Sequence, residues 1–140
     1  MIVPSHDQLA AALRDGGLRV TAPRLAVLSV VSEGKHMTAE QVAQAARERV
    51  GAISTQAVYD VLGALTRGGF VHRIEPAGSP ARYETRVGDN HHHVVCRSCG
   101  AISDVDCVVG DPPCVRPADA GGFVVDEAEV TFWGLCADCR

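Results

Sequence analysis

Two short cysteine motifs are the residues of this chain whose type and spacing most clearly predict chemistry. Cys96 and Cys99 form one CxxC pair, and Cys136 and Cys139 form the second. Each pair can bind one metal ion through two sulfurs, and two pairs complete the tetrahedral four-thiolate site that structural Zn²⁺ prefers. Disulfides or uncoordinated thiol pairs are the alternative. The spacing therefore predicts one structural zinc ion held by these four cysteines.

A run of three histidines, His91 to His93, precedes the first CxxC pair. A zinc ion that already has four thiolate ligands has no position left for them. Along an extended strand the side chains alternate between two faces, so the rings of His91 and His93 can point one way while His92 points the other. The triplet therefore indicates a second metal.

Charge and cysteine content divide the chain into two parts. Residues 1–83 carry nine Lys or Arg against seven Asp or Glu, whereas residues 84–140 carry four against ten, together with all six cysteines. We therefore expect two small domains, 1–83 and 84–140, each short of core and helped by a metal. No apolar run is long enough to span a membrane, no basic and then apolar leader opens the sequence, and metal-binding thiols fit a reducing compartment. These features predict a cytoplasmic protein.

The first part has the start and stop signals of four helices. Each expected helix begins after a capping residue (Ser5, Thr21, Thr38 and Ser54) and ends at a glycine (Gly16, Gly34, Gly51 and Gly68). Apolar residues recur at helical spacing, for example Leu9, Ala12 and Leu13, or Val58, Val61, Leu62 and Leu65. Segments 70–75 and 81–85 then form a hairpin across a turn rich in Pro and Gly. Helices followed by a hairpin predict a winged helix.

The fourth helix, expected at 54–67, is the natural reader of the DNA major groove in such a fold. Its outward residues include Gln56, which can pair with adenine through two hydrogen bonds, and Tyr59, which can contact a thymine methyl or a phosphate. Because this part is only weakly basic, an ordinary solvated helix face is the alternative. The predicted DNA-binding residues are Arg19, Thr21, Arg24, Lys35, Ser54, Thr55, Gln56 and Tyr59.

The second part has the composition of a small sheet. Strands are expected at 93–95, at 101–105 and along the segment 123–133. A sheet this small can scarcely stand alone, so zinc would close it and edge pairing with a second copy of the chain would complete it. The fold expected is α+β: an N-terminal winged helix-turn-helix domain and then a small α/β dimerisation domain with a four-cysteine zinc site.

Taken together, these motifs resemble the ferric uptake regulator (Fur) family of bacterial metal-dependent repressors. The resemblance rests on Thr21-Ala-Pro-Arg24, on Ala57-Val-Tyr59-Asp-Val-Leu62, on the histidine triplet and on the two CxxC pairs, in that order. It implies a homodimer that binds a double-stranded DNA operator. The run from Val87 to His93 is similar to that of actinobacterial repressors of a catalase-peroxidase gene, which are similar in role to the peroxide-responsive repressors.

The resemblance also implies a regulatory metal site, made of His36, Glu84, His91, His93 and Asp104. These nitrogen and oxygen ligands suit Fe²⁺ or Mn²⁺, with Zn²⁺ or Ni²⁺ as alternatives. Asp104 stands where peroxide sensors of the family tend to carry Asp and iron sensors Glu. Because His36 belongs to the first domain and the last three residues to the second, bound metal is expected to fix the angle between the domains and select the DNA-competent form.

The chain departs from the family pattern at several positions. Asn90 and Ala128 stand where a further metal site commonly has histidines. His92 and Asp111 remain as ligands for that site, which is therefore expected to be weak or absent. Asp60 stands where many members carry an arginine after the recognition tyrosine, so their phosphate contact is not expected here.

Four residues have no metal context in this pattern. Cys107 and Cys114 are additional cysteines, best interpreted as inert thiols, with a redox pair as the alternative. His6 and His72 are expected to be surface residues.

The function predicted from all these features is that of a metal-dependent, DNA-binding repressor, not an enzyme. It is expected to sense peroxide through Fe²⁺ and to control oxidative-stress genes; the alternative is a sensor of iron, zinc or nickel level that controls metal uptake. A zinc hydrolase or deaminase would need an open zinc position and a Glu placed as general base, but Glu84 lies on the wrong side of the expected linker and the catalytic HxE…PCxxC pattern is missing. A metal buffer would bind no operator. No membrane and no small-molecule substrate other than metal and peroxide are expected.

Overall fold

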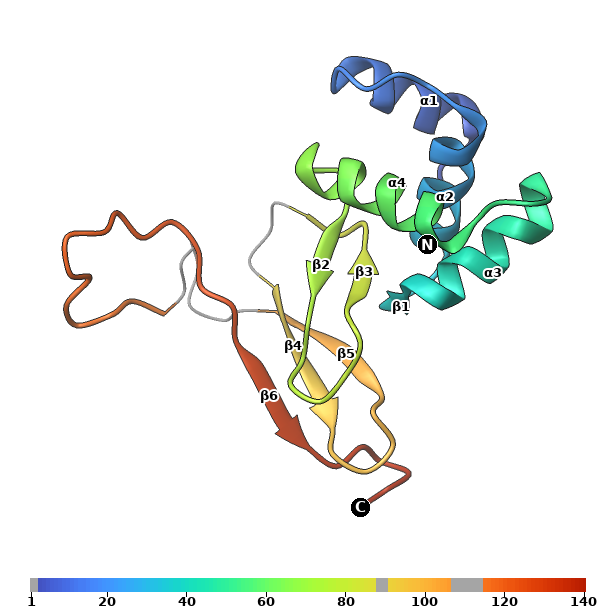
Figure 1. The fold of residues 1–140 in the computed structure, drawn as a ribbon. Coiled ribbons are helices and arrows are strands. Elements are labelled where there is room, and N and C mark those ends of the chain that lie inside the picture. Colours follow the sequence, from blue (N-terminus) through green and yellow to red (C-terminus); the bar gives the residue numbers. More distant parts are fainter. Residues whose placement is uncertain (1–2, 88–90, 107–114) are drawn as a thin grey trace. The chain divides into compact units, whose positions relative to one another are not determined.

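The computed structural model describes residues 3–87, 91–106 and 115–140. The chain divides into two compact units, residues 1–87 and residues 88–140. Figure 1 shows the helices and hairpin of the first unit and the strands of the second. The division falls a few residues beyond the boundary expected from charge, because Glu84 ends a strand that pairs within the first unit.

Four capped helices make up most of the first unit. The side-chain oxygens of Ser5, Thr21, Thr38 and Ser54 each accept a hydrogen bond from the backbone N–H of the third helical residue, which has no partner within the helix. The four helix starts expected from the sequence are therefore confirmed. The helices are α1 (His6–Asp15), α2 (Ala22–Glu33), α3 (Ala39–Val50) and α4 (Thr55–Arg67).

The core of the first unit forms around α2, which is buried from Ala26 to Val31. On α1, Leu9 and Leu13 are buried as expected, but Ala10 takes the inward place predicted for Ala12, which is exposed. At about 100° per residue, both alanines lie about 80° from the centre of the Leu9–Leu13 stripe, so the helical pattern cannot choose between them. The fully buried side chains of the core are Leu13, Val27, Val31, Val42, Val58, Leu62 and Leu65.

A three-stranded antiparallel sheet completes the first unit and confirms the winged-helix fold. Strands β2 (His72–Ile74) and β3 (Arg82–Glu84) form the expected hairpin, and β1 (Met37–Thr38) pairs with the other edge of β3. The sequence did not predict β1, because two residues are too few to show an alternating pattern. Its pairing places the α2–α3 connection beside the base of the wing, at Met37 opposite Tyr83.

The second unit contains a three-stranded sheet in the order β5-β4-β6. Strand β4 (His91–Cys96) lies in the middle, antiparallel to β5 (Ile102–Asp106) and parallel to β6 (Thr131–Gly134). The expected strands at 93–95 and 101–105 are therefore present. Because β4 and β6 are parallel, their carboxyl ends lie at the same end of the sheet.

The long strand expected at 123–133 is wrong over residues 123–130. Those residues form no strand, and the side chains of Phe123 and Val124 are 80% and 96% exposed. Alternation favours a strand only where a neighbouring strand supplies hydrogen bonds and a core covers one face. In the described part of the chain, β4 supplies that partner only from Thr131 onward.

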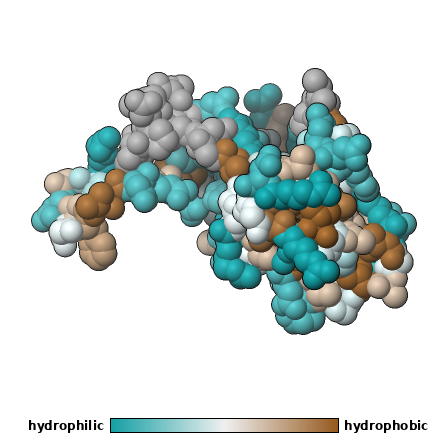
Figure 2. Space-filling view, turned by 90° about the horizontal axis from the view of Figure 1, so that it is seen from above, coloured by the Kyte–Doolittle hydropathy of each residue, from teal (hydrophilic) through white to brown (hydrophobic). Residues whose placement is uncertain are grey.

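Apolar side chains also reach the surface at the end of the second unit, where Phe132, Trp133 and Leu135 are at least 37% exposed. Figure 2 shows brown apolar atoms among teal hydrophilic ones on the face in view. Of the helices in the described ranges, none combines the length and the hydropathy needed to cross a bilayer.

Candidate functional site

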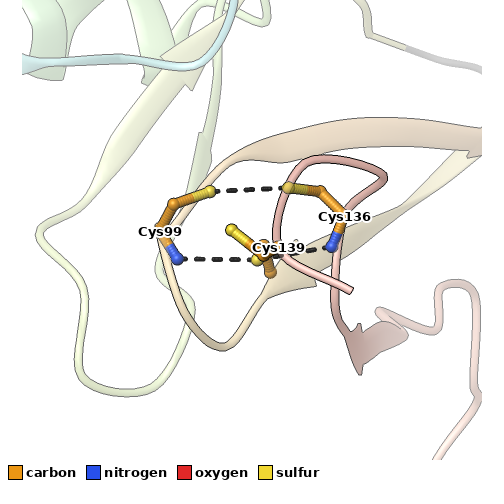
Figure 3. A group of neighbouring side chains, drawn as sticks. Cys99, Cys136 and Cys139 are labelled. Atoms are coloured by element: carbon orange, nitrogen blue, oxygen red, sulfur yellow. Dashed lines mark hydrogen bonds between the residues drawn. The ribbon is translucent and has the colours of Figure 1, made fainter.

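The four CxxC cysteines lie together at the end of the second sheet where β4 and β6 finish. Cys96 ends β4, Cys99 lies in the turn before β5, and Cys136 and Cys139 lie in the turn after β6. The parallel register pairs Cys96 with Gly134, which brings the two turns together. Figure 3 shows the side chains of Cys99, Cys136 and Cys139 meeting between these turns.

The spacing of the sulfur atoms fits a tetrahedral metal site. One sulfur from each of the four cysteines lies within 4.8 Å of the other three, and the Sγ atoms of Cys99 and Cys136 are 3.8 Å apart. Zn–S bonds of about 2.3 Å in a tetrahedron place sulfurs about 3.8 Å apart, whereas a disulfide bond is about 2.0 Å long. All four thiols are free. Both the residue types and the distance therefore fit Zn²⁺.

Hydrogen bonds prepare this cluster for a cation. The backbone N–H groups of Cys99 and Cys136 donate to Cys96 Sγ over 3.5 and 3.4 Å, and they lower the pKa of Cys96 to about 6. In contrast, the hydrogen bond with the Cys136 side chain raises the pKa of Cys139 to about 12. The protein thus favours the thiolate of Cys96, while hydrogen bonds from the neighbouring cysteines favour the protonated thiol of Cys139. A divalent cation would displace that proton.

The first unit holds a histidine–carboxylate pair made of two predicted regulatory ligands. His36 Nε2 lies 3.2 Å from Glu84 Oε2, and both side chains are buried. His72 Nδ1 lies 3.2 Å from the other oxygen, Glu84 Oε1. The expectation that His72 is an uninvolved surface residue is therefore wrong, because β2 and β3 pair in a register that sets His72 opposite Glu84.

The backbone around His36 is held in an unusual conformation. His36 has a φ of +52°, the left-handed region that residues with a Cβ seldom adopt. Arg82 Nη1 donates a hydrogen bond of 3.1 Å to the carbonyl oxygen of His36, and Arg82 Nε donates to Ser79 Oγ over 3.4 Å. Arg82 therefore connects a predicted metal ligand to the turn of the wing.

The second unit holds the other predicted regulatory ligands. His91 and His93 lie two residues apart on β4, and Asp104 faces His93 across the β4–β5 pair. Asp104 Oδ1 lies 3.3 Å from His93 Nε2 and 3.8 Å from His91 Nε2. The strand pairing therefore brings these three side chains together.

One pair in each unit, His36 with Glu84 and His93 with Asp104, has the spacing of ligands to one ion, whereas the 3.8 Å between His91 and Asp104 is longer. Nitrogen and oxygen atoms about 2.1 Å from a common metal lie about 3.0 to 3.4 Å apart in octahedral or tetrahedral geometry. The 3.2 Å of His36 and Glu84 and the 3.3 Å of His93 and Asp104 fall in that range. Two or three ligands are fewer than a divalent ion prefers, so neither group by itself is a complete metal site.

Of the two residues predicted for a weak extra metal site, His92 lies within the described residues. His92 is buried, and its Nδ1 accepts a hydrogen bond of 3.3 Å from the backbone N–H of Val130. That bond ties β4 to the residue before β6. Asp111, Cys107 and Cys114 lie outside the described residues.

Helix α4 presents the outward face expected of a DNA reader. Thr55, Gln56 and Tyr59 are exposed, whereas Val58 on the opposite side is fully buried. Gln56 Nε2 donates a hydrogen bond of 3.0 Å to Asp60 Oδ1. Ser54 has a structural role as well, because its oxygen caps the helix.

The predicted phosphate-binding residues lie in the same unit. Arg19 and Lys35 are exposed, and Arg24 Nη1 donates a hydrogen bond of 2.9 Å to the carbonyl oxygen of Arg19. The hydroxyl of Thr21 accepts from the backbone N–H of Arg24 and caps α2. Thr21 therefore supports this loop, whatever contact it makes with DNA.

Sequence reasoning missed one residue of this face, Arg47 on α3. Its Nε donates to the carbonyl oxygen of Ile53 over 3.0 Å, and its Nη2 donates to Thr55 Oγ1 over 2.9 Å. No motif marks Arg47 in the sequence, since its partners follow from the packing of α3 against α4.

Comparison with known proteins gives one consistent result. The model of the ferric uptake regulator family matches residues 15–110. The transcriptional regulator FurA of Mycobacterium tuberculosis is 58% identical over 135 residues, which cover 96% of this chain and 92% of the relative. Ferric uptake regulation protein 1 of Mycolicibacterium fortuitum is 59% identical, over 91% of this chain and 80% of the relative. The ferric uptake regulator of Pseudomonas aeruginosa, solved with manganese, has a TM-score of 0.68 at 26% identity, covering 92% of this chain and 98% of that one.

Proposed function

The chain belongs to the ferric uptake regulator family of metal-dependent transcriptional regulators, and we propose that this member represses its target genes when Fe²⁺ is plentiful. Members of the family are regulators rather than enzymes, and they bind DNA as dimers. Relatives of more than 50% identity include ferric uptake regulation proteins 1 and 2 of Mycolicibacterium fortuitum. Their names favour a sensor of iron level over the peroxide sensor predicted first.

A structural zinc ion is held by Cys96, Cys99, Cys136 and Cys139. The sulfur separation of 3.8 Å supports this assignment. The cysteines clamp the ends of β4 and β6, so the ion stabilises a sheet that is too small to be stable alone.

The regulatory ion is held by His36, Glu84, His91, His93 and Asp104. The observation that carries this proposal is the ligand-like spacing of one pair in each ligand group, 3.2 Å in the first unit and 3.3 Å in the second. When bound, the ion supplies the divalent charge that a histidine–carboxylate set favours; Fe²⁺ or Mn²⁺ suits these ligands, and Zn²⁺ or Ni²⁺ are the alternatives.

The residues of the two ligand groups explain how such a signal reaches DNA. Glu84 is the last residue of the wing strand β3, and His36 follows the last turn of α2, so ligation at both constrains the DNA-reading unit. His91, His93 and Asp104 belong to the unit that pairs with a second copy. One ion bound by both ligand groups selects the conformer in which the two α4 helices of a dimer match the two halves of the operator.

Metal-dependent DNA binding tests this function. The dimer, with its cysteine site filled, is titrated onto palindromic duplexes selected from a randomised library, with Fe²⁺ under anaerobic conditions, Mn²⁺, Zn²⁺ or Ni²⁺. We expect affinity to rise at least about tenfold with Fe²⁺ or Mn²⁺ and not to rise in an Asp104→Asn variant. Tight binding that is the same with and without metal would contradict the proposal.

Peroxide sensing is the second candidate, favoured by Asp104 beside His93 and His91. Bound Fe²⁺ can supply electrons to peroxide, and the rings of His36 and His91 are the side chains expected to gain an oxygen atom. Their weaker ligation would release DNA, whereas the Mn²⁺ form would stay bound. Peptide mass spectrometry after peroxide treatment tests this. If His36 and His91 are unmodified and dithiothreitol reverses the release of DNA, the sensing role belongs to the cysteines instead.

A further inference from the structure

The start of α4 is anchored more firmly than an N-cap alone achieves. The Ser54 hydroxyl accepts the backbone N–H of Ala57 over 3.0 Å. From α3, the guanidinium of Arg47 holds both the carbonyl oxygen of Ile53 and the hydroxyl of Thr55. The backbone that carries Gln56 is therefore fixed at the entrance of the recognition helix.

The side chain of Gln56 is also oriented, by Asp60 one turn later. Gln56 Nε2 donates to Asp60 Oδ1 over 3.0 Å, and both residues lie on the exposed face of α4. An ionised carboxylate only accepts hydrogen bonds, so the nitrogen of the Gln56 amide must face Asp60 and its oxygen must face away. Asp60 thus selects one of the two orientations that the amide could adopt.

This orientation is compatible with reading adenine. In the major groove, adenine presents the N7 acceptor beside the N6 donor, and a glutamine amide pairs with both through its oxygen and one N–H. That N–H is the one beside the amide oxygen. The second N–H points to the other side of the nitrogen and remains for Asp60. One glutamine can therefore bind Asp60 and adenine at the same time.

We propose that Asp60 positions the Gln56 amide so that the pair reads one adenine in each operator half-site. This inference rests on the proposed function, since it requires α4 in the major groove. Asp60 is a positioning residue that acts through Gln56 and does not itself contact the base.

Because Asp60 is charged, its removal should change overall DNA affinity and base discrimination in opposite directions. A carboxylate on the face that approaches phosphates lowers affinity for every duplex. Removing it therefore raises overall affinity while lowering discrimination at one base pair. A residue that only stabilised the helix would not separate these two quantities.

The experiment uses the full-length, zinc-containing, Mn²⁺-loaded dimer and duplexes selected from a randomised library. The base pair that depends on Gln56 is identified with Gln56→Ala, and Kd is measured for the selected operator and for operators changed at that pair. Asp60→Ala and the near-isosteric Asp60→Asn both remove the charge, but asparagine keeps an acceptor oxygen. Circular dichroism shows whether α4 remains folded in each variant.

We expect Asp60→Ala to reduce discrimination on the order of tenfold, toward the level of Gln56→Ala, and Asp60→Asn to keep most of it while gaining the same overall affinity. In the double variant Gln56→Ala/Asp60→Ala, the loss of Asp60 should reduce discrimination no further. Discrimination that is unchanged in Asp60→Ala, or lost equally in Asp60→Asn, would overturn the inference. A parent protein that binds no duplex with metal would instead overturn the proposed function.

Discussion

At the scale of single residues, this chain separates two kinds of metal chemistry by ligand type. The four sulfurs lie together at the end of β4 and in the turns after β4 and β6, whereas the histidine–carboxylate pairs lie on strands and in the connection after α2. Thiolates suit a permanent zinc ion, while nitrogen and oxygen ligands suit an ion that exchanges. Substitutions at the two sets should therefore have different consequences.

Cys96→Ser should remove the structural zinc and lower the free energy of unfolding by about 3 kcal/mol or more, because zinc binding to such a site is folding energy. Zinc content measured by atomic absorption and thermal unfolding check this. Asp138→Asn, at an exposed position between Cys136 and Cys139, is the matched control and should keep its zinc. A folded, zinc-free Cys96→Ser dimer would refute the assignment.

His93→Ala should leave the structural zinc in place but weaken regulatory Mn²⁺ binding about 100-fold or more, because its Nε2, 3.3 Å from Asp104, is one of the proposed ligand atoms. Titration calorimetry with Mn²⁺ measures the affinity, and zinc analysis of the same sample is the control. An unchanged Mn²⁺ affinity would exclude His93 from the site.

At the scale of helices and strands, polar side chains hold the elements of the first unit in place. On α2, Ser29 is buried and Glu33 is partly exposed, and both bind Arg49 of α3. On the wing, Arg82 binds the carbonyl oxygen of His36. These contacts join segments far apart in the sequence, so each can be tested for its effect on the position of a whole element.

Glu33→Gln should lower the free energy of unfolding at neutral pH by about 1 kcal/mol or less, because the pair is partly exposed. The hydrogen bond with Arg49 lowers the pKa of Glu33 below its usual 4.5. The stabilisation is therefore present above pH 4.5 and is lost as the pH falls through the folded-state pKa. The melting temperatures of parent and variant, measured across this pH range, should converge at acid pH. Glu48→Gln on α3 is the control, and a difference independent of pH would contradict the assignment.

Arg82→Ala should weaken regulatory Mn²⁺ binding by up to about tenfold, although Arg82 is not a ligand. A left-handed φ costs about 1 kcal/mol or more, and the hydrogen bond to the His36 carbonyl helps to hold it. Mn²⁺ titration measures the effect. Arg73→Ala is the control, because Arg73 of the same hairpin pairs with exposed Glu75 instead. Equal effects of both substitutions would assign the loss to general damage of the wing.

At the scale of the whole molecule, the two units differ in charge and in surface. The acidic second unit exposes apolar side chains on β6 and just after it, at Phe132 and Leu135. Strand β6 is also an edge of its sheet. An apolar sheet edge suits pairing with a second copy, as in a dimeric family of regulators.

Phe132→Lys should raise the dimer dissociation constant at least about tenfold, because a charge replaces an apolar side chain that is half exposed in the single chain. Sedimentation equilibrium measures the constant, with metal and without. Trp133 is left unchanged, since Arg97 stacks on its ring. Val124→Lys, in the exposed connection, is the control. A dimer unaffected at Phe132 would place the interface elsewhere.

The sequence by itself determined the elements whose signals are local. Helix starts depend on a capping oxygen three residues from its partner, and the reading face of α4 depends on periodicity, so Ser54 and Val58 sufficed to orient that helix. The two CxxC pairs likewise carry their chemistry in their spacing. For the same reason, the resemblance to a family could be recognised from residues alone.

The tertiary structure decided whatever depends on strand register and packing. Alternation over 123–130 gave no strand because, among the residues that the structure describes, a partner strand is found only from Thr131 onward. The β2–β3 register set His72 beside Glu84, and the packing of α3 against α4 brought Arg47 to the start of α4. These contacts join residues between 8 and 12 positions apart in the chain, at distances that no single-element pattern specifies. Their geometry exists only once the elements are packed.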